Sequence, residues 1–164
     1  MSRAFMKEDG AEPLLVVPRA PLPAGATNYV TRRGLAALHD ERALVEALRP
    51  IADDANGAAA LAAHNARLGA LEARIASAVA VDAATLPHDE VRFSAAVTLR
   101  SATGHERQYR LVGVDEADAQ SGRIAFVAPL ARELTGKRVG DVVTLRQHGA
   151  ETEYEIVVID YSQE

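Results

Sequence analysis

The hydrophobic period changes once along this chain of 164 residues. Between residues 30 and 80 the large apolar side chains recur at spacings of three, four and seven, as on one face of a helix. Between residues 88 and 161 they alternate with polar side chains, as in a strand with one buried face. Because the helical and strand periods are separated in sequence, the predicted fold class is α+β.

Residues 29–81 predict an antiparallel helical hairpin of the coiled-coil type. Thr31 is a good N-cap for a first helix that contains Leu38 and Val45. Pro50 and residues 53–57 then interrupt the helical period with turn residues. An alanine-rich second helix follows, with Leu61, Leu68, Leu71, Ile75 and Ala78 at the seam positions of a heptad. We expect two helices of about 18–22 residues joined by a short turn.

Residues 82–164 predict a small sheet domain. Alternating segments are expected as strands at 91–99, 108–114, 123–128, 142–147 and 153–160. A short helix at 130–135 should end at Gly136, which suits the position after a helix C-cap. We expect a mainly antiparallel sheet of five strands with the helix on one face.

Residues 1–28 predict a flexible, proline-rich tail. Four of the seven prolines fall here, at positions 13, 18, 21 and 23, and no helical or strand period is visible. Proline fixes its own φ and biases the preceding residue toward extended geometry. We therefore expect no packed element before residue 29.

Composition excludes several classes of site. The chain has no cysteine, its five histidines lie far apart in sequence, and no glycine-rich phosphate loop follows a strand. We expect no metal, no cofactor, no small-molecule substrate and no enzymatic activity of its own. The net charge is −5, so independent nucleic-acid binding is not expected. No apolar run is long enough for a membrane span, and we expect a cytoplasmic protein.

Three stretches of the chain resemble the Gre family of bacterial transcription elongation factors. They are residues 28–34 (NYVTRRG), 108–117 (QYRLVGVDEA) and 128–141 (APLARELTGKRVGD). The family begins the last of these with Ser-Pro, where this chain has Ala128 before Pro129. Residues 71–82 also resemble the end of the family's second coil helix, so the resemblance covers roughly residues 28–161.

The resemblance implies a coiled coil followed by an FKBP-like sheet domain. It further implies that RNA polymerase is the partner, with the sheet domain docked beside the polymerase secondary channel and the coil inserted into it. In the family, acidic residues at the coil tip help the polymerase hold a second metal ion and cut its own backtracked RNA. That chemistry is two-metal phosphodiester hydrolysis, in which the polymerase is the enzyme.

The coil tip departs from the family pattern. The family carries an Asp and a Glu three residues apart, whereas this chain has Asp53 and Asp54, and Gly57 stands three residues after Asp54. The match at residues 71–82 favours a deleted tip and shorter arms, as in the related regulator of nucleoside diphosphate kinase. Asp53 and Asp54 therefore have two interpretations: a residual metal-binding tip, or turn and N-cap residues of the second helix.

The family's docking region falls on two segments of the sheet domain. The matching residues are Asp115, Glu116, Ala117, Pro129, Leu130, Ala131 and Leu134. An exposed Pro-Leu pair beside a turn would make a small apolar anchor, although Leu134 could equally cap the sheet. We expect changes at Pro129 or Asp115 to weaken polymerase binding and to leave thermal stability nearly unaltered.

Three functions are compatible with these patterns. The first is a polymerase-binding elongation regulator with weak or no stimulation of transcript cleavage. The second is a full cleavage factor that uses Asp53 and Asp54. The third, a prolyl isomerase, follows only from the FKBP-like fold, and a chain with no Trp and few aromatic residues lacks the material for its aromatic pocket.

Overall fold

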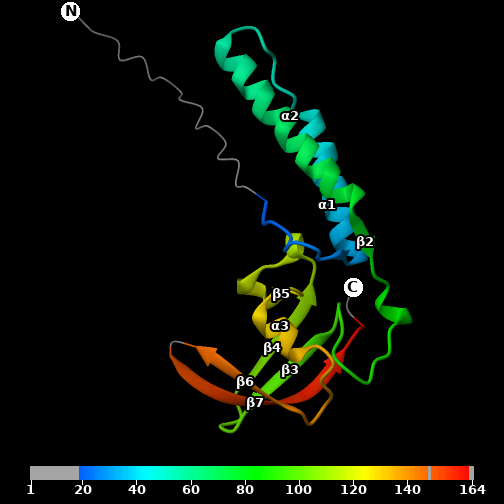
Figure 1. The fold of residues 1–164 in the computed structure, drawn as a ribbon, viewed down its shortest axis with the longest axis vertical. Coiled ribbons are helices and arrows are strands. Elements are labelled where there is room, and N and C mark those ends of the chain that lie inside the picture. The colour runs from blue at the N-terminus through cyan, green and yellow to red at the C-terminus, as the bar shows by residue number, and fades with distance from the viewer. Residues whose placement is uncertain (1–18, 148, 163–164) are drawn as a thin grey trace, which may run out of the picture.

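The computed structural model describes residues 19–147 and 149–162, which form a mixed α+β fold. Two long helices, α1 (Arg32–Ala47) and α2 (Ala55–Ala76), lie side by side and extend away from a curled sheet (Figure 1). The predicted tail lies mostly outside the described residues. Within them, no helix has the length and apolar character that a membrane span requires.

The helices pack through one small apolar cluster. Val30, Leu38, Val45 and Leu71 are buried in it, and Leu35, Leu68, Ile75 and Ala78 pack around them. Glu41 of α1 also pairs with Arg67 of α2 at 3.2 Å. Leu48, the C-cap of α1, is 65% exposed.

A two-stranded parallel sheet closes the base of the helix pair. Strand β1 (Asn28–Val30) precedes α1 and strand β2 (Ala78–Ala80) follows α2, with Asn28 opposite Ala78 and Val30 opposite Ala80. Asn28 also donates from its side-chain amide to the carbonyl of Arg74 at 2.9 Å. The sequence analysis did not predict β1 and β2, because a strand of three residues is too short to show an alternating pattern.

The main sheet has the strand order β5-β4-β3-β7-β6. Its strands are β3 (Ala96–Ser101), β4 (Glu106–Val112), β5 (Arg123–Ala125), β6 (Val142–Gln147) and β7 (Ala150–Asp160). Three pairings are antiparallel, and only β4 with β5 is parallel. The prediction of a mainly antiparallel sheet of five strands is confirmed.

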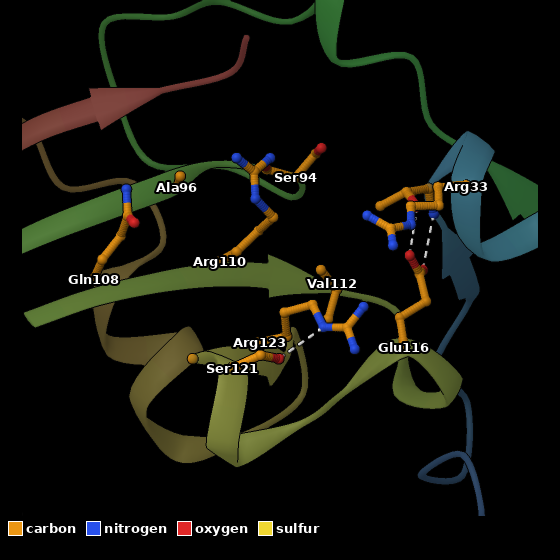
Figure 2. Close-up of a pocket in the computed structure, with 11 residues that line it drawn as sticks. Arg33, Ser94, Ala96, Gln108, Arg110, Val112, Glu116, Ser121 and Arg123 are labelled. Atoms are coloured by element: carbon orange, nitrogen blue, oxygen red, sulfur yellow. Dashed lines mark hydrogen bonds between the residues drawn. The ribbon is translucent and has the colours of Figure 1, made fainter. Parts of the chain in front are cut away.

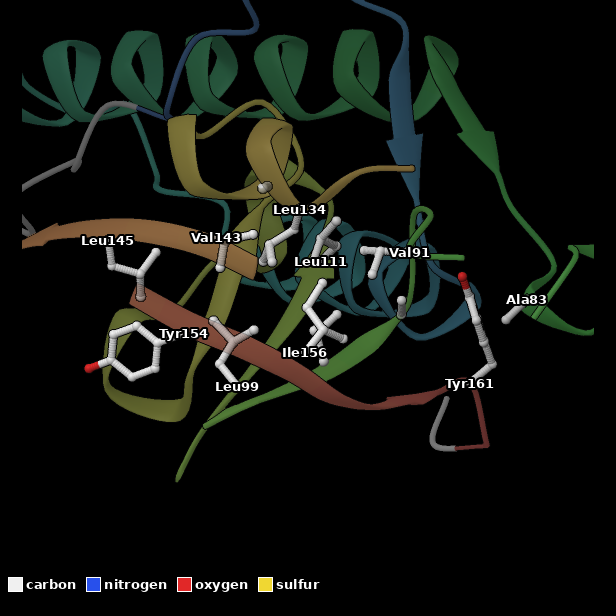
Figure 3. Close-up of a cluster of buried hydrophobic side chains, with 13 residues drawn as sticks. Ala83, Val91, Leu99, Leu111, Leu134, Val143, Leu145, Tyr154, Ile156 and Tyr161 are labelled. Carbon is white, nitrogen blue, oxygen red and sulfur yellow. The ribbon is translucent and has the colours of Figure 1, made fainter. Parts of the chain in front are cut away.

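The core of the sheet domain lies between the sheet and helix α3 (Pro129–Leu134) (Figure 3). Leu99, Leu111, Leu134 and Ile156 are almost fully buried there. The residue after the C-cap of α3 is Gly136, at φ +82°, and its N–H donates to the carbonyl of Val91 at 2.7 Å. This glycine thus ends α3 in the left-handed conformation that was expected of it.

Two predicted strands are shorter than expected. Residues 91–95 alternate in polarity, but Ser94 has φ +74° and Ala95 N–H bonds back to the carbonyl of Arg92, so extended pairing begins only at Ala96. Strand β5 ends at Ala125 because the chain turns there, with Ala128 N–H bonded to the Ala125 carbonyl. Three short 3₁₀ helices were not predicted: η1 (Ala83–Thr85), η2 (Val114–Glu116) and η3 (Ala119–Ser121).

Candidate functional site at the junction of the helices and the sheet

Asp115 lies in the interior of the junction between the helices and the sheet domain. Its carboxylate is 2.8 Å from Arg19 Nη1 and 3.3 Å from Arg74 Nε. The side chains of Asp115 and Arg74 are only 6% and 9% exposed. This buried pair joins η2 of the sheet domain to α2. It contradicts the expectation that Asp115 can be changed with little effect on stability, because the change would leave Arg74 without its buried partner.

Glu116 holds the first turn of α1. Its carboxylate accepts from the N–H of Thr31 at 3.0 Å, from the Thr31 hydroxyl, and from the N–H of Gly113 at 3.1 Å. Thr31 is in turn the N-cap of α1, and its hydroxyl oxygen accepts from Gly34 N–H at 2.9 Å. A negative charge beside a helix N-terminus is favourable, so Glu116 stabilises the start of α1 from another part of the fold.

Two glycines leave room for the Glu116 carboxylate. A Cβ on Gly34 would overlap that carboxylate, and a Cβ on Gly113 would come within 2.6 Å of Glu116 Oε2 and 2.8 Å of the Tyr29 carbonyl. The φ of Gly113 is −62°, a value that any residue can adopt. Close packing, rather than backbone conformation, accounts for the glycine here.

Arg19 extends the junction toward the helices. Its guanidinium also pairs with Glu41 at 2.6 Å, and Glu41 pairs with Arg67 of α2. Partial burial alone would raise the pKa of Glu41, but hydrogen bonds and charge from Arg19 and Arg67 outweigh it and lower that pKa below its usual value. The segment around Arg19 therefore connects α1, α2 and η2.

The predicted docking residues divide into buried and exposed sets. Ala131 and Leu134 are fully buried in the core, so their side chains are not at the surface. Leu130 is half-buried against the same core. Pro129, at the first position of α3, and Ala117 are exposed. Both segments contact β5, and among the predicted docking residues Ala117 and Pro129 are exposed whereas Glu116 and Leu130 are half-buried.

The predicted tip acids lie at the far end of the helices. Asp54 is the N-cap of α2 and accepts from Gly57 N–H at 2.6 Å. Asp53 is exposed and makes no hydrogen bond or ion pair with the described residues. Among those residues, no three acidic or histidine side chains gather in a way that could hold a metal ion.

A pocket of about 240 Å³ opens where α1 meets β4 and β5 (Figure 2). Arg33, Arg110 and Arg123 line it, together with Glu116 and Ser94. The sequence analysis did not single out these arginines. They are spread over 91 positions of the chain, and no local pattern marks residues that only the tertiary fold brings together.

Residues 86–161 match the family model described as "Transcription elongation factor, GreA/GreB, C-term". The chain is 39% identical over 100 residues to transcription elongation factor GreA of Legionella pneumophila (strain Corby), covering 60% of this chain and 62% of that protein. It is 37% identical over 152 residues to GreA of Methylobacterium nodulans, covering 81% of this chain and 96% of the relative.

Solved structures of lower identity were also matched. The elongation factor GreA/GreB from Nitrosomonas europaea is 20% identical, with a TM-score of 0.44, over 81% of this chain and 98% of that one. The GreA factor homolog Gfh1 of Thermus thermophilus is 22% identical, with a TM-score of 0.39, over 82% of this chain and 99% of that one. Membership follows from the sequence match along nearly the whole Methylobacterium nodulans relative: the chain belongs to the GreA/GreB family of transcription elongation factors.

Proposed function

We propose that this protein is a transcription elongation regulator of the Gre type that binds RNA polymerase in the cytoplasm. The sheet domain, of the FKBP-like type, docks beside the secondary channel, and α1 and α2 form a short coiled-coil hairpin that enters it. The polymerase supplies the metal and the catalysis, and this protein stimulates transcript cleavage weakly or not at all. Family membership supports the general role, and the tip of the helix pair supports the weak cleavage.

The observation that carries the proposal is the bond between Asp54 and the N–H of Gly57. The Asp54 carboxylate is engaged as the N-cap of α2, and the residue three positions later is Gly57 and not an acid. A cleavage factor needs carboxylate oxygens free to coordinate a metal ion and a second acid to hold the other ion or water.

A second candidate function is full cleavage stimulation through Asp53 and Asp54. Its support is Asp53, which is exposed at the tip and has no partner among the described residues. Adjacent residues on a loop can converge on one ion, although adjacent residues on a helix point roughly 100° apart. Asp53 precedes the helix, so local geometry leaves this function open to test.

A cleavage assay on backtracked elongation complexes separates the two functions. Under the proposal, a saturating amount of the protein does not accelerate cleavage, and it slows the cleavage driven by a full-length Gre factor through competition for the dock. Asn retains N-cap ability, so Asp54→Asn removes the charge and keeps the cap. Strong cleavage that disappears in Asp53→Ala and Asp54→Asn would establish the second function instead.

Docking is tested through Pro129. Pro129→Ser removes an exposed apolar group and is expected to weaken binding to core RNA polymerase about tenfold, with little change in melting temperature. Pro87→Ser is the matched control, because Pro87 is also exposed and lies outside α3. Equal binding by Pro129→Ser and the control would remove α3 from the docking surface.

A further inference from the structure

The pocket at the junction is lined by three arginines that come from separate elements. Arg33 lies in the first turn of α1, Arg110 in β4 and Arg123 in β5 (Figure 2). We propose that this arginine pocket (Arg33, Arg110 and Arg123) binds the polyphosphate group of a small phosphorylated ligand, such as a nucleoside diphosphate. The inference goes beyond the proposed function, which requires no small ligand.

Two of the guanidinium groups are held in place by the pocket itself. Arg110 Nη1 donates to the carbonyl of Ser94 at 3.3 Å. Arg123 Nε donates to the Ser121 hydroxyl at 3.0 Å, and its Nη2 lies 3.4 Å from Asp118. A guanidinium carries five N–H donors, so these contacts leave donors for a phosphate. Fixing the groups in advance reduces the entropy lost on binding.

Of the three pocket arginines, Arg33 has the fewest partners to balance its positive charge. Its side chain is exposed, and it has no hydrogen bond or ion pair within residues 19–147 and 149–162. It lies in the first turn of α1, where a positive side chain is unfavourable beside the positive end of the helix dipole. A bound anion would relieve that repulsion and use the planar, bidentate geometry in which arginine binds phosphate.

Three carboxylates lie at or near the pocket, those of Glu116, Asp118 and Asp160, and each already has a partner within the fold. The carboxylate of Glu116 is occupied by Thr31 and Gly113. Asp118 pairs with Arg123 at 3.4 Å on a well-exposed surface, where an ion pair is weak and a phosphate can replace it. Asp160 has a lowered pKa, owing first to hydrogen bonds from Ser162 and also to the charge of Arg110, and its own charge opposes an anion at that arginine.

The wall of the pocket contains a strained residue. Ser94 is the one non-glycine residue with positive φ, +74°, in the part of the chain that the structure describes, and it is completely buried. Its carbonyl is the acceptor for Arg110. Such conformations are unfavourable, and they persist where the surrounding structure enforces them, often at ligand sites. In this protein the conformation of Ser94 orients its carbonyl toward Arg110, and that hydrogen bond positions the arginine side chain.

Size and charge favour a small ligand over RNA. The volume of 240 Å³ is below the roughly 300–1,000 Å³ of pockets that enclose a whole drug-sized molecule. Phosphates would occupy the pocket, with the remainder of the ligand outside. The net charge of −5 opposes the approach of a long polyanion, whereas a local group of arginines can hold a short one. Because Arg33 belongs to α1 and the other two to the sheet, the ligand would bridge the two parts.

The test is calorimetric titration of the full chain, without polymerase, with ADP, inorganic pyrophosphate and adenosine. We expect ADP and pyrophosphate to bind, adenosine not to bind, and binding to weaken as salt is raised. Arg33→Gln and Arg123→Gln should each weaken ADP binding at least tenfold. Arg132→Gln, an exposed arginine on α3 with the same change of charge, should have no effect.

Each result of these titrations either supports or overturns the proposed phosphate site. ADP binding that exceeds pyrophosphate binding would add a contact to the nucleoside, and equal binding would confine recognition to the phosphates; both support the site. No binding of either compound at 1 mM, an equal loss in Arg132→Gln, or binding of a short single-stranded RNA alone would overturn it. Melting curves of Arg33→Gln establish folding, since this side chain has no partner among the described residues to lose.

Discussion

The carboxylate of Glu116 accepts hydrogen bonds from both the backbone N–H and the hydroxyl of Thr31, although 85 positions separate the two residues. The bond to the N–H spans 3.0 Å. It ties the start of the helix pair to η2, which follows strand β4 of the sheet. The orientation of the helices is therefore fixed by a side chain outside them.

Glu116→Gln should lower the free energy of unfolding by about 1–3 kcal/mol. The amide keeps the shape of the side chain but replaces one charged acceptor oxygen with a donor facing N–H groups. Urea unfolding measures the loss, and hydrogen exchange should show lower protection at Thr31 and Gly34. Glu155→Gln, on an exposed position of β7, is the control and should change stability by less than about 0.5 kcal/mol. Equal losses in the two variants would contradict the proposed role of Glu116.

Asp115→Ala should destabilise the protein by about 3–5 kcal/mol, because it leaves the buried guanidinium of Arg74 without its partner. Removal of the exposed pair between Glu151 and Arg146 by Glu151→Ala should cost less than about 1 kcal/mol. Thermal and urea unfolding of both variants provide the comparison. Equal losses of stability in the two variants would show that Asp115 is no more buried than Glu151. Polymerase binding by an Asp115 variant must therefore be corrected for its folded fraction.

Acid should remove the stabilisation that Glu41 provides. Its pKa is lower in the folded protein than the ordinary value of 4.5, so folding favours the charged form. The contribution is fully present above about pH 4.5 and is lost as pH falls through the lower, folded pKa. Unfolding curves between pH 3 and 7 should show a smaller acid loss in Glu41→Gln than in the natural sequence. Parallel curves for the two proteins would show that Arg19 and Arg67 do not stabilise this carboxylate.

Leu71→Ala should cost about 2–5 kcal/mol, because Leu71 is completely buried in the cluster that joins α1, α2 and β1. Leu48→Ala removes the same number of atoms from a side chain that is 65% exposed, and it should change stability by less than about 0.5 kcal/mol. Circular dichroism during urea unfolding measures both. Similar losses would mean that the helix pair contributes little through this cluster.

Sequence patterns predicted the positions of the helices and strands better than they predicted the contacts between those elements. The alternation at residues 91–99 correctly marked Val91, Val97 and Leu99 as buried, because alternation reports burial of one face. It could not report that Ser94 turns the chain before β3, since that conformation depends on Leu111 and Arg110, which contact it from β4. The pairing of β1 with β2 was missed for a similar reason: Asn28 and Ala78 are brought together only when the helices fold.

The residues of the candidate site could also be predicted from the sequence only in part. Asp54 could be predicted as an N-cap from its position before an alanine-rich helix, and the structure places it there. The family resemblance identified Asp115 and Glu116 as site residues but did not identify their partners. Arg74 and Thr31 are distant in sequence, and without them an acidic residue in a turn is expected to face solvent. Arg33, Arg110 and Arg123 form a pocket only through the tertiary fold, so their spacing carried no signal.

The parallel pairing of β1 with β2 makes the helix pair a module of adjustable length. The chain leaves the junction at Val30 and returns to it at Ala78, and these two points are held next to each other whatever lies between them. Matched deletions or insertions in α1 and α2 would therefore change how far the tip reaches, by about 1.5 Å per residue, while the base and the sheet stay as they are. The length of the helix pair can thus vary in evolution independently of the sheet domain.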